Sequence, residues 1–98
     1  MDAVTPSEGW GVLHLFYRID RERAVAEPDA AKQVLAAIEG LEADGHQALV
    51  SAALGHKADL GIMALGPDLA RLQAFQAELA GTPLRLESSF VSLTETSE

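Results

Sequence analysis

The first regular pattern in the chain is an apolar run from Trp10 to Ile19. Side chains alternate between the two faces of an extended strand. One face carries Gly11, Leu13, Leu15, Tyr17 and Ile19, and the other carries Trp10, Val12, His14, Phe16 and Arg18. Both faces are largely apolar, whereas a strand with one solvated face would alternate apolar with polar residues. The pattern therefore predicts a strand that is covered by helices on the first face and by something else on the second.

Two later segments have the three-and-four spacing of amphipathic helices. The first begins near Pro28-Asp29 and runs to about Ala43, and the second opens at Gly66-Pro67-Asp68 and ends at Gly81. Their apolar stripes are Ala31, Val34, Leu35, Ile38 and Leu41 in the first, and Leu69, Leu72, Phe75 and Leu79 in the second. Gly40 inside the first helix costs about 1 kcal/mol relative to alanine, which indicates either close packing or simple toleration.

The remaining apolar segments predict three more strands. They span 46–54, 59–65 and 84–93, and 55–58 forms a compact turn between the first two of them. The stretch from Asp20 to Pro28 is a charged connection. The predicted order is therefore strand, helix, strand, strand, helix, strand. This order is typical of an α+β, ferredoxin-like β-α-β-β-α-β domain, with a four-stranded antiparallel sheet and both helices on one face.

The length of 98 residues fits one such domain, with flexible tails at 1–9 and 94–98. Two helices cover only one face of a sheet, so the other face is expected to be open. The residues assigned to this face are Val12, His14, Phe16, Met63 and Phe90. An apolar patch of this kind predicts an interface. We expect a second copy or another ferredoxin-like domain to pack there and close an α+β barrel, whose interior either holds a ligand or is packed solid.

Composition narrows the classes of partner. The formal net charge is −8, and the seven Lys and Arg residues are spread along the chain, which argues against nucleic acid. No apolar run approaches the ~20 residues of a membrane helix, and the start of the chain lacks a secretory signal pattern, so the chain is expected to be cytoplasmic. Cysteine is absent, which excludes disulfides and thiolate chemistry.

No catalytic, cofactor-binding or metal-binding set emerges from the residues. A lone histidine on an apolar strand, such as His14, is more often a core residue than a ligand or base. His46 and His56 are expected to be exposed at opposite ends of one strand, too far apart to share a metal. Met63 is interpreted as a core residue rather than a haem ligand, and no carboxylate pair or activated serine has a convincing position.

Three segments resemble the N-terminal half of the chlorite dismutase and coprohaem decarboxylase family. They are EGWGVLHLFYRID at Glu8 to Asp20, GHKADLGIMALGPDLARLQ at Gly55 to Gln73, and SSFVSLTETSE at Ser88 to Glu98. The resemblance implies two ferredoxin-like domains per subunit, closed into a barrel and assembled into a homo-oligomer. It also implies a haem or coprohaem cofactor held by the C-terminal domain and, for the decarboxylases, a role in haem biosynthesis.

The family's haem ligands have no matching positions in this sequence. His14 and His56 do not correspond to the proximal ligand, and Tyr17 does not correspond to the relay tyrosine. The first hypothesis is therefore a structural and assembly half of a haem-dependent oxidoreductase or decarboxylase, inactive on its own. The alternative is a stand-alone dimeric barrel that binds a small molecule or acts as a small oxidoreductase or monooxygenase, with a pocket lined by His14, Phe16, Met63 and Phe90. A purely structural oligomerisation module is the third hypothesis.

Overall fold

The computed structural model describes residues 10–53 and 58–94. The four predicted strands are present: β1 (Gly11–Ile19), β2 (Gln47–Ala52), β3 (Leu60–Gly66) and β4 (Leu84–Leu93). Three helices connect them: α1 (Arg21–Ala26), α2 (Ala30–Ala43) and α3 (Leu69–Leu79). The expected turn at 55–58 and the two expected tails lie largely outside the described residues.

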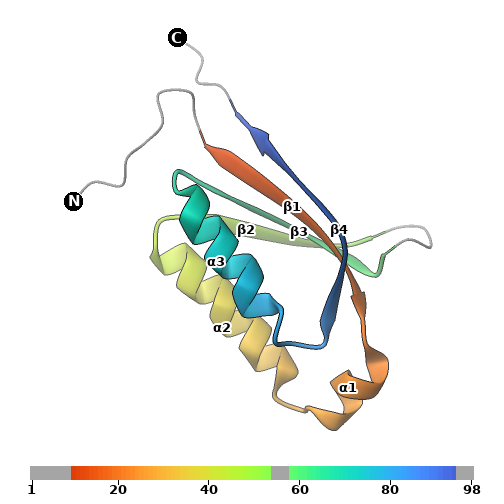
Figure 1. Cartoon of the computed structure of the whole chain (residues 1–98). Coiled ribbons are helices and arrows are strands. Elements are labelled where there is room, and N and C mark those ends of the chain that lie inside the picture. Colours follow the sequence, from red (N-terminus) through yellow and green to blue (C-terminus); the bar gives the residue numbers. More distant parts are fainter. Residues whose placement is uncertain (1–9, 54–57, 95–98) are drawn as a thin grey trace.

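The strands form one antiparallel sheet in the order β2-β3-β1-β4. Helices α2 and α3 lie side by side on one face of this sheet (Figure 1). The predicted α+β, ferredoxin-like arrangement is therefore confirmed. We refer to the face without these helices as the open face, and to the other as the helix face.

The stretch after β1 was predicted to be a connection, and this prediction was wrong because the stretch contains the short helix α1. The Asp20 carboxylate accepts a hydrogen bond from the backbone nitrogen of Arg23 at 3.1 Å, which caps the helix start. Six residues are too few to show a helical apolar stripe, and none of them is buried. Local capping, rather than a periodic pattern, accounts for this helix.

The core lies between the helices and the helix face. The β1 residues Leu13, Leu15 and Tyr17 point into it, as the alternation along β1 predicted. The largest fully buried side chains are Tyr17, Phe75, Leu15, Leu41, Ile62 and Leu79. They come from β1, α2, β3 and α3, so one core holds both βαβ halves together.

His46 was expected to be exposed, but it is buried, with only 5% of its surface accessible. Its Nδ1 lies 3.0 Å from the Asp44 carbonyl, and the backbone nitrogen of Asp68 lies 3.2 Å from its Nε2. A tautomer with the proton on Nδ1 donates to Asp44 and accepts from Asp68. The ring therefore joins the end of α2 to the start of α3, and Gly66 provides the space for it.

Gly40 is tolerated in α2 and is not required there. A Cβ at this position would have Arg71 Nη2 as its nearest neighbour, at 3.5 Å, which is ordinary contact with a long side chain. We expect Gly40→Ala to raise the free energy of unfolding by about 0.5–1 kcal/mol, because alanine restricts the unfolded chain and favours the helix. Urea denaturation measures the change, with the exposed neighbour Glu39→Ala as control. A lower midpoint for Gly40→Ala would show that the α2–α3 contact needs the glycine.

Candidate interaction face

The open face is organised in rows that cross all four strands. The strand register places Leu49, Met63, His14 and Phe90 opposite one another in a central row. The next row lies two residues away from the central row on each strand. It consists of Ser51, Gly61, Phe16 and Ser88. On the other side of the central row lie Gln47, Leu65, Val12 and Ser92.

The central row carries the large exposed apolar side chains of this face. Leu49 is 59% exposed, Phe90 54% and Met63 38%. Val12 was assigned to the same face but is only 6% exposed, so it offers little surface to a partner. Large apolar side chains that cross a whole sheet and remain accessible are the usual mark of an interaction surface.

The ring of His14 is held in place by two neighbours. It stacks on Phe90 with ring centroids 4.2 Å apart and an interplanar angle of 12°. Its Nε2 lies 3.2 Å from the Ser92 hydroxyl oxygen. Phe16 extends the aromatic cluster, with its centroid 6.2 Å from that of Phe90. The ring of His14 is thus engaged by residues of the same face.

Small residues surround Phe16 in the next row. A Cβ on Gly61 would lie 3.4 Å from the Phe16 ring, so the glycine lets that ring rest against the backbone of β3. Ser51 and Ser88 stand at the two edges of the same row. At both edge strands and at β3, the side chains of this row therefore rise less far above the sheet than those of the central row.

A bulge in β4 separates the apolar rows from a charged end. Phe16 is opposite Ser88, but Tyr17 is opposite Leu86, so Glu87 is the extra residue. Glu87 lies 3.4 Å from Arg18 and 3.9 Å from Arg85, which are themselves opposite each other. One carboxylate thus lies between two guanidinium groups that would otherwise repel.

The helix face is not fully covered, contrary to the expectation from two helices on one face. Val91 and Leu93 of β4 are 59% and 63% exposed. A hollow of about 300 Å³ lies beside them, lined by Leu13, Leu69, Leu72, Gln73, Gln76 and Val91. The helices pack over β2 and β3 more than over β4, so the inner side of this edge strand is left bare.

A second hollow, of about 430 Å³, lies where α1, the end of α3 and the start of β4 meet. Tyr17 lines it, and among the described residues its buried hydroxyl has no hydrogen-bond partner. Burial raises the pKa of Tyr17 from its ordinary value of 10.0 to about 12, because the charged phenolate is disfavoured away from water.

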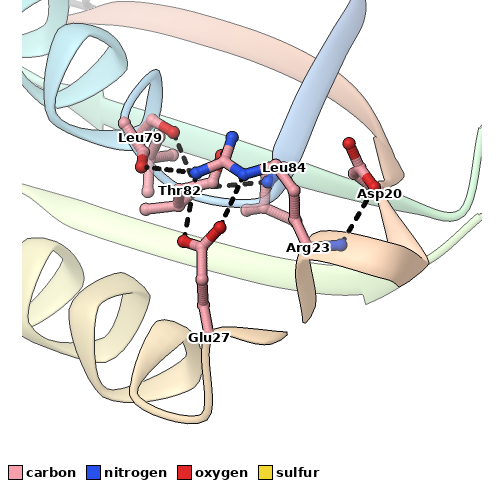
Figure 2. Close-up of polar contacts among 7 residues, drawn as sticks. Asp20, Arg23, Glu27, Leu79, Thr82 and Leu84 are labelled. Carbon is pink, nitrogen blue, oxygen red and sulfur yellow. Dashed lines mark hydrogen bonds and ion pairs between the residues drawn. The ribbon is translucent and has the colours of Figure 1, made fainter. Parts of the chain in front are cut away.

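Arg23 links α1 to the loop before β4 through hydrogen bonds. Figure 2 shows its guanidinium between the Glu27 carboxylate and backbone carbonyls. The distances are 2.7 Å from Nε to Glu27 Oε2, 3.1 Å from Nη1 to the Thr82 carbonyl and 3.2 Å from Nη2 to the Gly81 carbonyl. The hydrogen bond lowers the pKa of Glu27 and raises that of Arg23. All three guanidinium nitrogens of Arg23 are therefore engaged.

No metal centre is visible within residues 10–53 and 58–94, where no three His, Asp or Glu side chains come together in a way that could hold an ion. None of the helices in that part of the chain is long and apolar enough to cross a membrane. Of the site residues predicted from sequence, His14, Phe16, Met63 and Phe90 do meet on one face. His56 lies outside the described residues, and Leu49 was not foreseen because its place in the central row depends on the register of β2 against β3.

No protein-family model matches the chain. A candidate haem-binding protein of Natronomonas pharaonis is 33% identical over 103 residues, which cover 92% of this chain and 17% of that protein. The structure of a haem-binding protein from Thermus thermophilus is 30% identical, with a TM-score of 0.75 over 91% of this chain and 41% of the other.

Chlorite dismutase from Candidatus Nitrospira defluvii shares the fold. One variant superimposes with a TM-score of 0.77 at 15% identity over 93% of this chain and 42% of the other. The chain thus spans less than half the length of the solved structures that it matches, and a smaller share of the curated relative. The resemblance to one ferredoxin-like half of chlorite dismutase-like proteins is confirmed.

Proposed function

We propose that this chain is the structural and assembly half of a haem-dependent, chlorite dismutase-like protein. In this role its open face packs against a second ferredoxin-like domain that holds the haem. The observation that carries the proposal is the central row of the open face, where Leu49, Met63 and Phe90 are exposed across the sheet. Sheet-on-sheet packing buries such a row in a shared core about 10 Å thick.

The contacts of the two described histidines support a half without its own haem ligand. A histidine that ligates haem iron presents a free nitrogen to an open site. His14 Nε2 is engaged by Ser92, and its ring lies flat against Phe90. His46 has both nitrogens close to backbone groups and is buried. These contacts support the proposal that the haem-iron ligands belong to the second domain, and we derive no reaction for this chain.

Haem titration of the purified chain tests the proposal. Haem and coprohaem are added stepwise while the Soret band is recorded. We expect at most the weak, broad absorbance of non-specific binding, because the proposal places the haem-iron ligands in the second domain. Tight stoichiometric binding with a sharp Soret band would overturn the proposal.

The second candidate function is the stand-alone barrel with a pocket next to His14. The observation in its favour is that His14, Phe16, Met63 and Phe90 do lie together on the open face. The same titration with His14→Ala separates the two candidates. Loss of a sharp Soret band in this variant would favour the barrel, whereas an unchanged band would remove His14 as its ligand.

A further inference from the structure

We propose that the hollow where α1, the end of α3 and the start of β4 meet binds a neutral small molecule with an apolar body and a carbonyl oxygen. The oxygen accepts a hydrogen bond from the Tyr17 hydroxyl. The hollow lies on the helix face (Figure 1), away from the open face that the proposed function assigns to a second domain. The inference therefore goes beyond the proposed function and does not depend on it.

The hydroxyl of Tyr17 is the observation that points to a ligand. Only 2% of the surface of this residue is accessible, and among the described residues its oxygen has no hydrogen-bond partner. Nearly all buried polar groups in folded proteins are hydrogen-bonded, because an unpaired group loses its water without compensation. Tyr17 also lines the hollow of about 430 Å³. A ligand with an accepting oxygen would supply the missing partner.

Several other polar groups in the walls already have partners. Figure 2 shows the Arg23 guanidinium turned toward Glu27 and the carbonyls before β4, and its three nitrogens are hydrogen-bonded there. The Thr82 hydroxyl donates to the Leu79 carbonyl at 2.7 Å. One carboxylate oxygen of Asp20 caps α1. These contacts fix the walls of the hollow and leave the phenol as its buried donor.

Two glutamine amides on α3 add adaptable polar groups. Gln73 and Gln76 line the hollow, and within 10–53 and 58–94 neither amide takes part in a hydrogen bond. An amide can donate or accept, so it can serve a second polar atom of the ligand. Much of the remaining wall is apolar and consists of Ala77, Ala80, Pro83, Leu84 and Leu86. Apolar walls with a few placed polar groups are the usual composition of a small-molecule site.

Charge favours a neutral ligand over a carboxylate. The two arginines that line the hollow are already paired, Arg23 with Glu27 at 2.7 Å and Arg85 with Glu87 at 3.9 Å. The Asp20 carboxylate lines the same wall and would repel a second carboxylate. A carbonyl oxygen accepts a hydrogen bond without carrying a charge. A pure hydrocarbon would leave the phenol unpaired.

Titration with acetophenone, benzoate and isopropylbenzene tests the inference, because the three probes have nearly the same shape and differ in the accepting group. Tyr17 is the single tyrosine of the chain, so the NMR signals of carbon-13-labelled tyrosine report on this ring alone. We expect acetophenone to shift these signals with a dissociation constant in the millimolar range, as suits a probe of few atoms. Benzoate should bind at least about tenfold more weakly, because its charge must leave water.

Tyr17→Phe removes only the hydroxyl. We expect it to weaken the binding of acetophenone at least about tenfold and that of isopropylbenzene less than about twofold, because only the ketone loses a hydrogen bond. Binding to this variant is followed through the backbone amide signals of the residues that line the hollow. The variant should stay folded, since the hydroxyl has no partner among the described residues to leave unpaired.

Ala77→Trp fills the hollow, and Ala74→Trp is its matched control. Both alanines are exposed on α3, but of the two only Ala77 lines the hollow. We expect Ala77→Trp to abolish the shift of the Tyr17 signals on addition of acetophenone, and Ala74→Trp to change the dissociation constant by less than about twofold. Circular dichroism verifies that each variant is folded.

Three results would overturn the inference. They are unshifted Tyr17 signals up to the solubility limit of acetophenone, equal affinity for benzoate and the ketone, or an equal effect of Tyr17→Phe on the ketone and the hydrocarbon. The last result would mean that the ligand oxygen does not pair with the hydroxyl. None of them changes the haem titration, so failure of this inference and failure of the proposed function are distinguishable.

Discussion

Gly66→Ala should lower the free energy of unfolding by about 3–5 kcal/mol. A Cβ at this position would overlap the ring of His46, which cannot move because backbone groups hold it on both sides. Overpacking of a core costs about 1–3 kcal/mol, and a buried polar group that loses its partner adds about 1–3 kcal/mol. This would be a large share of the ~5–15 kcal/mol that stabilises a domain. Chemical denaturation with urea measures the change.

Gly11→Ala is the matched control. Gly11 pairs with Gly66 across the two central strands, and a Cβ there would also meet a side chain. That side chain is Leu69, which is 52% exposed and can turn away into solvent. We expect a much smaller loss than at Gly66. Addition of His46→Ala to Gly66→Ala should cost less than the sum of the two single changes, because the clash is gone. Strict additivity would contradict this explanation.

Phe75→Ala should destabilise the domain by about 3–5 kcal/mol, because it leaves a cavity in the core between α3 and the sheet. Phe75 is fully buried and contacts the cluster that holds both halves together. Phe90 is the same residue type but is 54% exposed on the open face. We expect Phe90→Ala to change the stability of the monomer by less than about 1 kcal/mol, since most of its surface is already in water.

Thermal and urea unfolding of dilute protein compares the two phenylalanine variants without the influence of association. Phe75→Ala should lower both midpoints, and Phe90→Ala should leave them nearly unchanged. A large loss for Phe90→Ala in the monomer would mean that this ring supports the fold and is not reserved for a partner.

The arrangement of the fold was predictable because its signals are local and periodic. Leu13, Leu15 and Tyr17 alternate with Val12, His14 and Phe16 along β1, and this alternation predicted both faces correctly. The stripe predicted for α3 is correct for Leu72, Phe75 and Leu79, which are buried. It is wrong for Leu69, which is 52% exposed, and the stripe predicted for α2 is wrong for Leu35, which is 58% exposed. Hydrophobic periods of two and of three to four residues arise from the geometry of the backbone alone, so they can be interpreted without knowledge of tertiary contacts.

The burial of His46 could not be predicted in this way. Its environment depends on Asp44, Asp68 and Gly66, and Asp68 and Gly66 lie about twenty residues further along the chain. The absence of a side chain at Gly66 creates the space, but a glycine just before a predicted helix is equally consistent with an ordinary turn. The exposure of Leu49 was missed for a similar reason, because it depends on the register of β2 against Met63.

Because of its bulge, alternation along β4 does not predict which residues share a face. A strict alternation would place Leu86 and Phe90 on the same face, since they are four residues apart. The extra residue, Glu87, changes the parity, so Leu86 lies opposite Tyr17 on the helix face while Phe90 lies opposite His14 on the open face. A bulge depends on how two strands pair, so the sequence pattern of one strand alone does not predict it.

The same bulge determines where this strand tolerates a change of length in evolution. A residue lost or gained elsewhere between Ser88 and Leu93 would exchange the two faces of the remainder of β4. Loss of Glu87 would instead restore a regular strand and leave Leu86, Ser88 and Phe90 on their present faces. The cost would be electrostatic, because Arg18 and Arg85 would lose the carboxylate between them. Relatives of different length should therefore differ at this position, and those without the extra residue should also lack one of the two arginines.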